Sequence, residues 1–522
     1  MRQEEVGMKR RGPFKVLVGV AAAGMVAWLA SSAAASLADG PENIYTNESG
    51  LNGAAGTTDP NRLAGPDVNP GGIGQVLFAG YYDVRNVVNP GPGLLEPQVT
   101  NIQIVNTAPI PDNTEQGVLA RIRFRESKTS QEVLDFNIVL SCGQVWVASV
   151  FLDASVDLPA IKSPDPVVTN DPTVSTTIQY SPVLTTPQRF IKPASLTNDD
   201  IKRGYFEVFA EEAIPCAPSA GDERTGTYNR LGANKIDPQR TPPNSLGGVV
   251  FLVRAQSGIS YEYNMTAISR FVAAGQGSIT ASVLSPNPDT RNCIFSDGSM
   301  GDNCIHAVDL VLSKNRIMFQ WDELTITGAQ TYLVASFPTK HHHCAVAAGD
   351  YTGAGNDVSQ APFTCTPVAS GGEEVGCTLY NRVEDVLSES NIFSPGEQTR
   401  CFLPREVTIL AMVRSDAECD PASPLHDLRC DVGLDYANLP NHPEFGGNAN
   451  ETGWVDIDTD FGLHFRSGLD PTYAQILGLG VNEYRGMPMI ANVIQEFVNV
   501  AVQGVYGNMV PAMYEVAYSN AS

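Results

Sequence analysis

Apolar and polar residues alternate with a period of two in the stretch from Gly117 to Leu152, and this pattern restricts the fold more than any other feature of the chain. The first run, GVLARIRFRE, places Val118, Ile122 and Phe124 on one side and its arginines on the other. A repeat of two residues is that of a β-strand. The run therefore predicts a half-buried strand whose arginines face away from the core.

Two further runs follow within the same stretch. EVLDFNIVL resumes the alternation, with Leu134, Phe136 and Ile138 on one side, as expected of an antiparallel neighbour. The run from Val145 to Leu152 is apolar on both faces, which predicts a strand covered on both sides, with Trp146 as its largest side chain. Together the three strands predict a sandwich core.

Short strand patterns separated by turn residues recur along the chain, and no helix-length pattern follows each strand. This favours antiparallel sheets over a parallel α/β fold. We predict an all-β protein with one or two Ig-like antiparallel β-sandwiches and long disulfide-stapled loops. A chain of 522 residues exceeds one ordinary core. The predicted divisions are a signal peptide at 1–38, a flexible N-terminal arm at 39–74, a β-sandwich domain at 75–275 and a cysteine-rich β domain at 276–522.

The first 38 residues have the order of a secretory signal. Basic residues come first, an apolar core runs from Val16 to Ala30, and Ser36-Leu37-Ala38 is a small-residue cleavage site. This predicts export to the periplasm, cell surface or extracellular space. Cleavage and retention as an anchor both stay open, although the apolar run is short for a membrane span. No later segment is long and apolar enough to cross a bilayer.

The chain is acidic, with 33 Lys and Arg against 57 Asp and Glu and a formal net charge of −24. Such a charge repels nucleic acid and anionic lipid, so we expect no nucleic-acid partner. It suits a soluble surface protein, and it favours cation binding at carboxylate-rich loops. Tyr81, Tyr82 and Trp146 could line a glycan- or protein-binding face, although the aromatic core of a sandwich gives the same pattern. The oligomeric state is left open.

Ten cysteines follow the signal segment, which is typical of an oxidising destination. None forms a CxxC or CxxCH motif, which disfavours haem attachment, a zinc ribbon and a thioredoxin-type site. Three pairs are close enough in sequence to close short local loops, and two pairs complete the set. The predicted pairs are Cys293 with Cys304, Cys365 with Cys377, Cys419 with Cys430, Cys142 with Cys216 and Cys344 with Cys401.

A run of three histidines before Cys344 invites a metal interpretation, because imidazole is a good ligand for copper and zinc. On a strand only alternate side chains share a face, so His341 and His343 are the candidate ligands. Exposed histidines at the end of a strand are the other interpretation.

Asp456, Asp458 and Asp460 alternate in a way that is typical of a calcium loop. The EF-hand requires glycine at the sixth position and glutamate at the twelfth, where this chain has Phe461 and Ser467. An irregular calcium site and a solvated acidic strand face are therefore the two interpretations. Calcium is the one cofactor that this pattern suggests.

Arg121, Arg123 and Arg125 form a cationic row on an acidic protein. Such a row can recognise carboxylates of a ligand or partner. Pairing with Glu132 and Asp135 across the predicted ladder is the other interpretation, since opposite charges on neighbouring strands stabilise a sheet modestly. We favour the structural interpretation.

Catalytic motifs are weak in this sequence. Ser299 lies in GSMG, which lacks the first glycine of the GxSxG elbow, and there is no HExxH, Walker A or dinucleotide glycine pattern. Glycosidases on β-scaffolds need no local signature, so a secreted polysaccharide hydrolase stays open as an alternative.

Several motifs are together similar to an uncharacterised family of exported bacterial β-rich proteins. They are GQVLFAGYYDVRN, TNIQIVNTAP, ARIRFRE followed by EVLDFNIVLS and VW, RGYFEVFAEE, TYLVASFPTK and RGMPMI. The resemblance implies an exported β-protein and carries no activity, cofactor or catalytic residue. From residues and resemblance together we predict an exported periplasmic or cell-surface binding or structural protein that is not an enzyme, with the hydrolase and a calcium- or copper-binding surface protein as alternatives.

Overall fold

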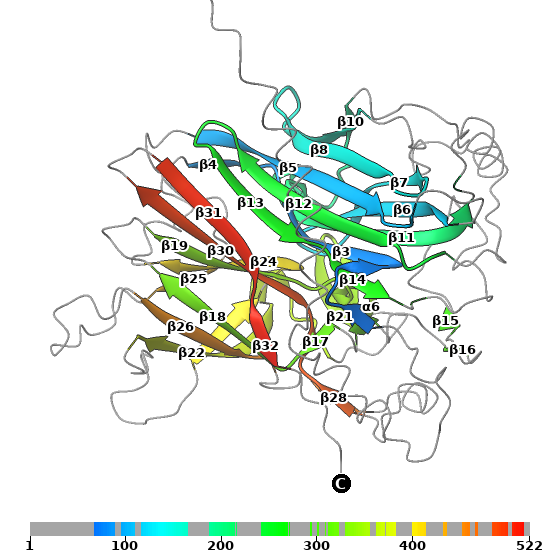
Figure 1. Cartoon of the computed structure of the whole chain (residues 1–522). Helices are drawn as coiled ribbons and strands as arrows, with labels where there is room; N and C mark the ends of the chain where they lie inside the picture. Colours follow the sequence, from blue (N-terminus) through cyan, green and yellow to red (C-terminus); the bar gives the residue numbers. More distant parts are fainter. Residues whose placement is uncertain are drawn as a thin grey trace, which may run out of the picture. The chain divides into compact units, whose positions relative to one another are not determined.

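The computed structural model describes residues 67–88, 95–109, 116–164, 187–214, 216, 242–269, 271, 293–294, 300–301, 308–309, 312–322, 329–354, 362–370, 372–382, 399–403, 405–413, 432–435, 452–459, 465–467, 483–499 and 504–515. The predicted signal peptide lies outside these residues. The described chain is built mainly of antiparallel β-sheets, as predicted (Figure 1). None of its helices is long and apolar enough to span a membrane.

Two sheets come from the N-terminal half. Sheet I has the strand order β1 (Asp67–Asn69), β14 (Thr266–Ser269), β3 (Val76–Asp83), β11 (Arg203–Ile214), β6 (Gly117–Glu126) and β7 (Glu132–Leu140). Sheet II has the order β10 (Gln188–Arg189), β9 (Leu158–Lys162), β8 (Val145–Asp153), β5 (Leu95–Asn106), β12 (Leu246–Arg254) and β13 (Ile259–Asn264). The short strands β2 (Ile73–Gly74) and β4 (Asn86–Val88) pair with β12 and β5.

Two further sheets come from the C-terminal half. Sheet III has the order β25 (Val432–Asp435), β24 (Val407–Val413), β19 (Gln330–Ser336), β30 (Ile490–Asn499) and β31 (Gly504–Pro511), and its β24–β25 pair is parallel. Sheet IV has the order β23 (Thr399–Leu403), β22 (Glu373–Asn381), β26 (Thr452–Asp458), β18 (Arg316–Asp322) and β32 (Met513–Glu515).

Minor elements complete the described chain. The strand pairs are β15 (Cys293–Ile294) with β16 (Met300–Gly301), β17 (Ser313–Lys314) with β29 (Met487–Pro488), β20 (Cys344–Ala347) with β21 (Asp350–Ala354), and β27 (Phe465–Ser467) with β28 (Glu483–Arg485). The single-turn helices are α3 (Asn198–Ile201), α6 (Lys340–His343) and the 3-10 turn η4 (Val368–Ser370).

Strand β19 shows how the sheets are layered. Its Tyr332 and Val334 belong to the apolar core that sheets I and II share, whereas Leu333 and Ala335 belong to a second core with sheet IV. Because side chains alternate across a strand, sheet III is apolar on both faces. One core therefore runs across the boundary that the sequence suggests near residue 275.

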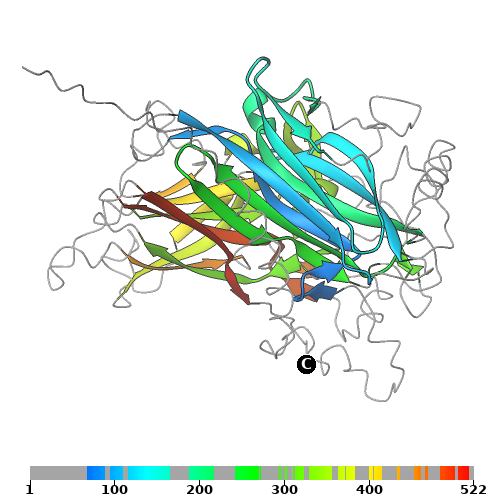
Figure 2. The ribbon, with the colours of Figure 1, turned by 45° about the horizontal axis from the view of Figure 1, so that its top comes forward.

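Two glycines mark close approaches between the sheets of the two halves. A Cβ on Gly80 of β3 would lie 2.8 Å from Ile490 of β30, and the Ser336 hydroxyl donates to the Gly80 carbonyl. Strand β13 lies beside β31 (Figures 1 and 2), and a Cβ on Gly507 would lie 2.1 Å from the Tyr261 ring. Both contacts need a residue without a side chain.

Burial reverses two of the sequence predictions. Strand β6, predicted to be half-buried, is buried along its whole length. Strand β8, predicted to be covered on both faces, alternates instead, and its Val145 and Val147 are 47% and 36% exposed. Order also begins earlier than predicted, because β1 and β2 lie inside the expected flexible arm and pair with β14 and β12.

Candidate functional site

The arginine row of β6 is the first candidate site, and the structure places it inside the protein. Arg121, Arg123 and Arg125 are 2%, 7% and 5% exposed. Arg121 pairs with Asp135, and Arg123 Nε lies 2.9 Å from Glu132 Oε2, so the predicted cross-strand pairing to β7 is confirmed. These contacts support the structural interpretation of the row.

The third arginine leads into a larger polar network around the β6–β7 hairpin. Arg125 pairs with Glu207 of β11 and donates to the Ser130 carbonyl at 2.9 Å. Glu126 accepts hydrogen bonds from the Thr129 amide at 2.9 Å, the Thr129 hydroxyl at 2.8 Å and the Gln131 amide at 2.9 Å. A buried carboxylate thus organises the turn from within.

The hairpin is also held by elements distant in sequence. The Val407 amide of β24 donates to the Ser127 carbonyl at 2.9 Å, and the Ser127 hydroxyl donates to the Asp200 carbonyl at 3.0 Å. Asp200 closes the capping box of α3 with Thr197 and pairs with Arg405 at 2.9 Å. Burial raises the pKa of Asp200, but the Thr197 hydrogen bonds and the Arg405 guanidinium outweigh it and lower the pKa.

Next to this hairpin lies a second set of fully buried ionisable groups. Lys340 Nζ is 3.1 Å from Glu373 Oε1, and both side chains are 0% exposed. Glu406 is equally buried, and burial raises its pKa to about 8, although the nearby Lys340 charge opposes the shift. The Glu406 carboxyl is therefore neutral at pH 7.

The histidines lie on α6, a single helical turn, and not on a strand as predicted. His343 Nε2 is 2.8 Å from Asp309 Oδ2 with both side chains fully buried, whereas His341 Nδ1 is 3.5 Å from the Tyr205 hydroxyl. Successive residues on a helical turn point in different directions, which separates the two candidate ligands. Within the described ranges no group of three or more His, Cys, Asp or Glu residues could hold a metal ion.

The acidic candidates of β26 lie on a half-exposed strand face. Asp456 and Asp458 share that face, and Arg316 Nε donates to Asp456 Oδ1 at 2.7 Å. Asp460 lies outside the described residues. The ion pair with β18 supports the interpretation of a solvated acidic face for the two that are described.

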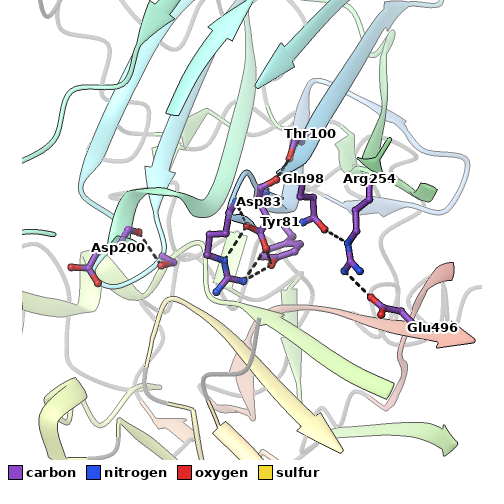
Figure 3. Close-up of polar contacts among 9 residues, drawn as sticks. Tyr81, Asp83, Gln98, Thr100, Asp200, Arg254 and Glu496 are labelled. Atoms are coloured by element: carbon purple, nitrogen blue, oxygen red, sulfur yellow. Dashed lines mark hydrogen bonds and ion pairs between the residues drawn. The ribbon is translucent and has the colours of Figure 1, made fainter. Parts of the chain in front are cut away.

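Sequence reasoning missed a buried ion pair between the two halves of the chain. Arg254 Nη2 lies 2.8 Å from Glu496 Oε1 (Figure 3), with side chains 0% and 1% exposed. Tyr261 donates to the same carboxylate. Gln98 accepts from Arg254 Nε at 3.0 Å. The signal available in the sequence is a charged residue at the end of the apolar run VVFLVR and another inside ANVIQEFVNV.

A related network lies in β3 (Figure 3). The Tyr81 hydroxyl donates to Asp83 Oδ2 at 2.6 Å, and Arg85 donates to both carboxylate oxygens at 3.0 and 2.8 Å. Burial raises the pKa of Asp83, but Arg85 and Tyr81 outweigh it and lower the pKa. Tyr81, Tyr82 and Trp146, which could line a binding face, are fully buried core residues.

Lys314 is a fully buried lysine that the sequence pattern does not mark as unusual. Burial lowers its pKa to about 7, and Nζ donates to the carbonyls of Leu312 at 3.2 Å and Met489 at 2.7 Å. A neutral amine carries two N–H donors, so both can be satisfied by these carbonyls. The lysine thus joins β17 to the segment beside β29.

The disulfides agree only in part with the predicted pairs. Cys142 is bonded to Cys216 as predicted, but Cys344 is bonded to Cys365. Because Cys344 and Cys365 are bonded to each other, the predicted pairs of Cys344 with Cys401 and Cys365 with Cys377 are wrong. Cys377 also belongs to a disulfide, but its partner is a cysteine other than Cys365. The predicted pairs of Cys293 with Cys304 and Cys419 with Cys430 rest on side chains outside those the structure describes.

No protein-family model, no curated protein and no solved structure matches this chain.

Proposed function

We propose that the chain is an exported binding or structural protein of the periplasm or cell surface and that it is not an enzyme. One observation carries the proposal: the arginines that the sequence offers for ligand recognition are buried and paired with carboxylates of the same chain. The arginine row, Arg254 and Glu496 stabilise the contacts between strands and sheets. The Cys142–Cys216 and Cys344–Cys365 disulfides suit an oxidising destination.

The same observation argues against the hydrolase. Glu406 has the raised pKa of a general acid, but it is fully buried. A polysaccharide hydrolase needs two carboxyl groups that flank an open cleft. A carboxyl group without solvent access cannot protonate a glycosidic oxygen.

The outer face of sheet II is the surface that we assign to binding. Val145 and Val147 of β8 are exposed there, and Val145 lies opposite Val105 of β5. Phe151 and Phe251 are half-buried on the same face. Exposed aliphatic side chains beside aromatic rings are typical of a protein–protein contact, so we infer a protein partner in the cell envelope.

Cell fractionation tests this function. The wild-type protein is expected in the envelope fraction, and the double variant Val145→Asp with Val147→Asp is expected in the soluble exported fraction with an unchanged melting temperature. Ser260→Asp is the matched control, because Ser260 is exposed on the same face but on β13, which β5 and β12 separate from the two valines of β8. Envelope retention of the double variant, or a wild-type protein that stays in the cytoplasm, would contradict the proposal.

A further inference from the structure

Lys340 and Glu373 meet in the interior of the protein as an amine and a carboxyl group. Nζ and Oε1 are 3.1 Å apart, and both side chains are fully buried. The contact has the distance of an ion pair, but Nζ makes no hydrogen bond within the described part of the chain. The amine is therefore held against the carboxyl group without the usual directed bond.

The surrounding chain fixes both groups in place. The Cys344–Cys365 disulfide ties the end of α6, which carries Lys340, to the segment that binds Glu373. In that segment the Thr364 amide and hydroxyl donate to Glu373 Oε2 at 2.7 and 2.6 Å, and the Cys365 amide donates to Oε1 at 3.1 Å. Such fixed proximity lowers the barrier of an intramolecular reaction, because the entropy of bringing the two groups together has already been lost.

Aromatic rings and a neutral acid complete the environment. Nζ lies 4.6 Å from the centroid of the Tyr351 ring and 5.8 Å from that of Phe337. Glu406, which interacts electrostatically with Lys340, is fully buried and holds its proton at pH 7. The amine and the carboxyl group therefore meet in a water-excluded site that also contains a proton donor.

We propose that Lys340 and Glu373 are joined by an intramolecular amide bond in the mature protein. The Nζ lone pair attacks Glu373 Cδ, the Cδ–Oε1 bond breaks, and Oε1 leaves as water with two protons that come from the ammonium group. An ammonium and a carboxylate are thus replaced by one neutral amide and one water, with no oxidant, reductant or co-reactant. Glu406 relays the protons and is unchanged at the end.

The hydrogen bonds to Glu373 fit this reaction. The Thr364 donors hold Oε2, which keeps its bond to Cδ and carries the negative charge of the tetrahedral intermediate. Preorganised donors at a developing oxyanion are a large source of rate acceleration. The product would link α6 to β22 beside a disulfide that already links α6 to the preceding segment, and it would survive reduction of that disulfide. This inference does not depend on the proposed function.

Mass spectrometry of the purified, exported, full-length mature protein tests the bond. After the N-terminus is sequenced and all disulfides are reduced, the chain is expected to be lighter than its sequence by the mass of one water. Trypsin is expected to leave Lys340 uncleaved and to release one branched peptide that contains Lys340 and Glu373. A wild-type chain of full mass would overturn the proposal without any variant.

Two variants test whether the loss of one water depends on the Lys340 amine. Lys340→Arg keeps the positive charge but removes the nucleophilic amine, so the full mass is expected. Glu374→Gln alters the neighbouring half-buried acid of the same strand and is expected to keep the loss of water and the branched peptide. A Lys340→Arg chain that still lacks one water, or a branch point at another residue, would contradict the assignment.

Discussion

Arg254, Lys314 and Glu406 lie at positions where burial alone would favour an apolar side chain. Two of them are held by groups far from them in sequence: Arg254 by Glu496, 242 residues away, and Lys314 by the Met489 carbonyl, 175 residues away. The pairing of Arg123 with Glu132 could be predicted because a hairpin brings them together. The distant partners could not, since the sequence pattern does not specify which sheets stack.

Glu406 gives the stability of the protein a pH dependence of known sign. Its pKa is raised from 4.5 to about 8 in the folded protein, so between these pH values the folded chain holds a proton that the unfolded chain has lost. Stability therefore falls as pH rises through this window, by up to about 1.4 kcal/mol per pH unit. The direction is the same whether Lys340 is an ammonium group or an amide.

The variant Glu406→Gln removes the titrating carboxyl group and with it this pH dependence. Urea unfolding at pH values between about 5 and 8 is expected to show that the wild type loses stability relative to the variant as pH rises. Parallel curves for the two proteins would show that the Glu406 carboxyl is not neutral in the folded state.

Lys314 gives the stability of the protein a pH dependence of the opposite sign at higher pH. Its pKa is lowered from 10.5 to about 7, so in that window the unfolded chain binds the additional proton and stability rises with pH. Lys314→Met is expected to flatten this rise in unfolding experiments between about pH 7 and 9. The reference is the wild type in the same buffers, and an unchanged slope in the variant would contradict the buried neutral amine.

In strands β6 and β8 the sequence period predicts the strand itself but not the burial of its two faces. The alternation in β6 was correct, but both of its faces are buried because its arginines are paired inside the protein. The apolar run of β8 leaves Val145 and Val147 exposed. A period assigns side chains to two faces of a strand, and it contains no information on what covers the second face.

The β6–β7 hairpin depends on hydrogen bonds inside its turn. The Thr129 hydroxyl donates to the buried Glu126 carboxylate at 2.8 Å, so Thr129→Ala is expected to cost about 1–3 kcal/mol of unfolding free energy. Thr352→Ala, at an exposed threonine, is the control and is expected to change stability by less than about 0.5 kcal/mol. Equal effects of the two variants in urea unfolding would contradict the role of the turn.

At the scale of the whole molecule, buried charge and a shared apolar core join the two halves. The all-β class could be predicted because strand periodicity is a local property. The stacking of sheet III against the first core could not, because it depends on both faces of β19 and on contacts such as Ser336 with Gly80. We conclude that the halves form one structural unit.

Substitutions at the Arg254–Glu496 pair show how much this ion pair between the two halves contributes to stability. Arg254→Met leaves the Glu496 carboxylate buried without its guanidinium and is expected to cost about 3–5 kcal/mol. The double variant Arg254→Met with Glu496→Leu is expected to recover much of this loss in urea unfolding, because no unpaired charge remains. Additive losses in the double variant would show that the two side chains do not interact.

Tryptophan fluorescence during urea unfolding can show whether the two halves unfold as one unit. Trp146 is buried in the first core, whereas Trp321 is buried in the second and Trp454 stacks on Tyr380 in sheet IV. In the signal-cleaved protein, Trp321→Phe with Trp454→Phe reports the N-terminal half and Trp146→Phe reports the C-terminal half. Transitions with the same midpoint after correction for each variant's stability are expected, and two separate transitions would contradict the conclusion that the halves form one structural unit.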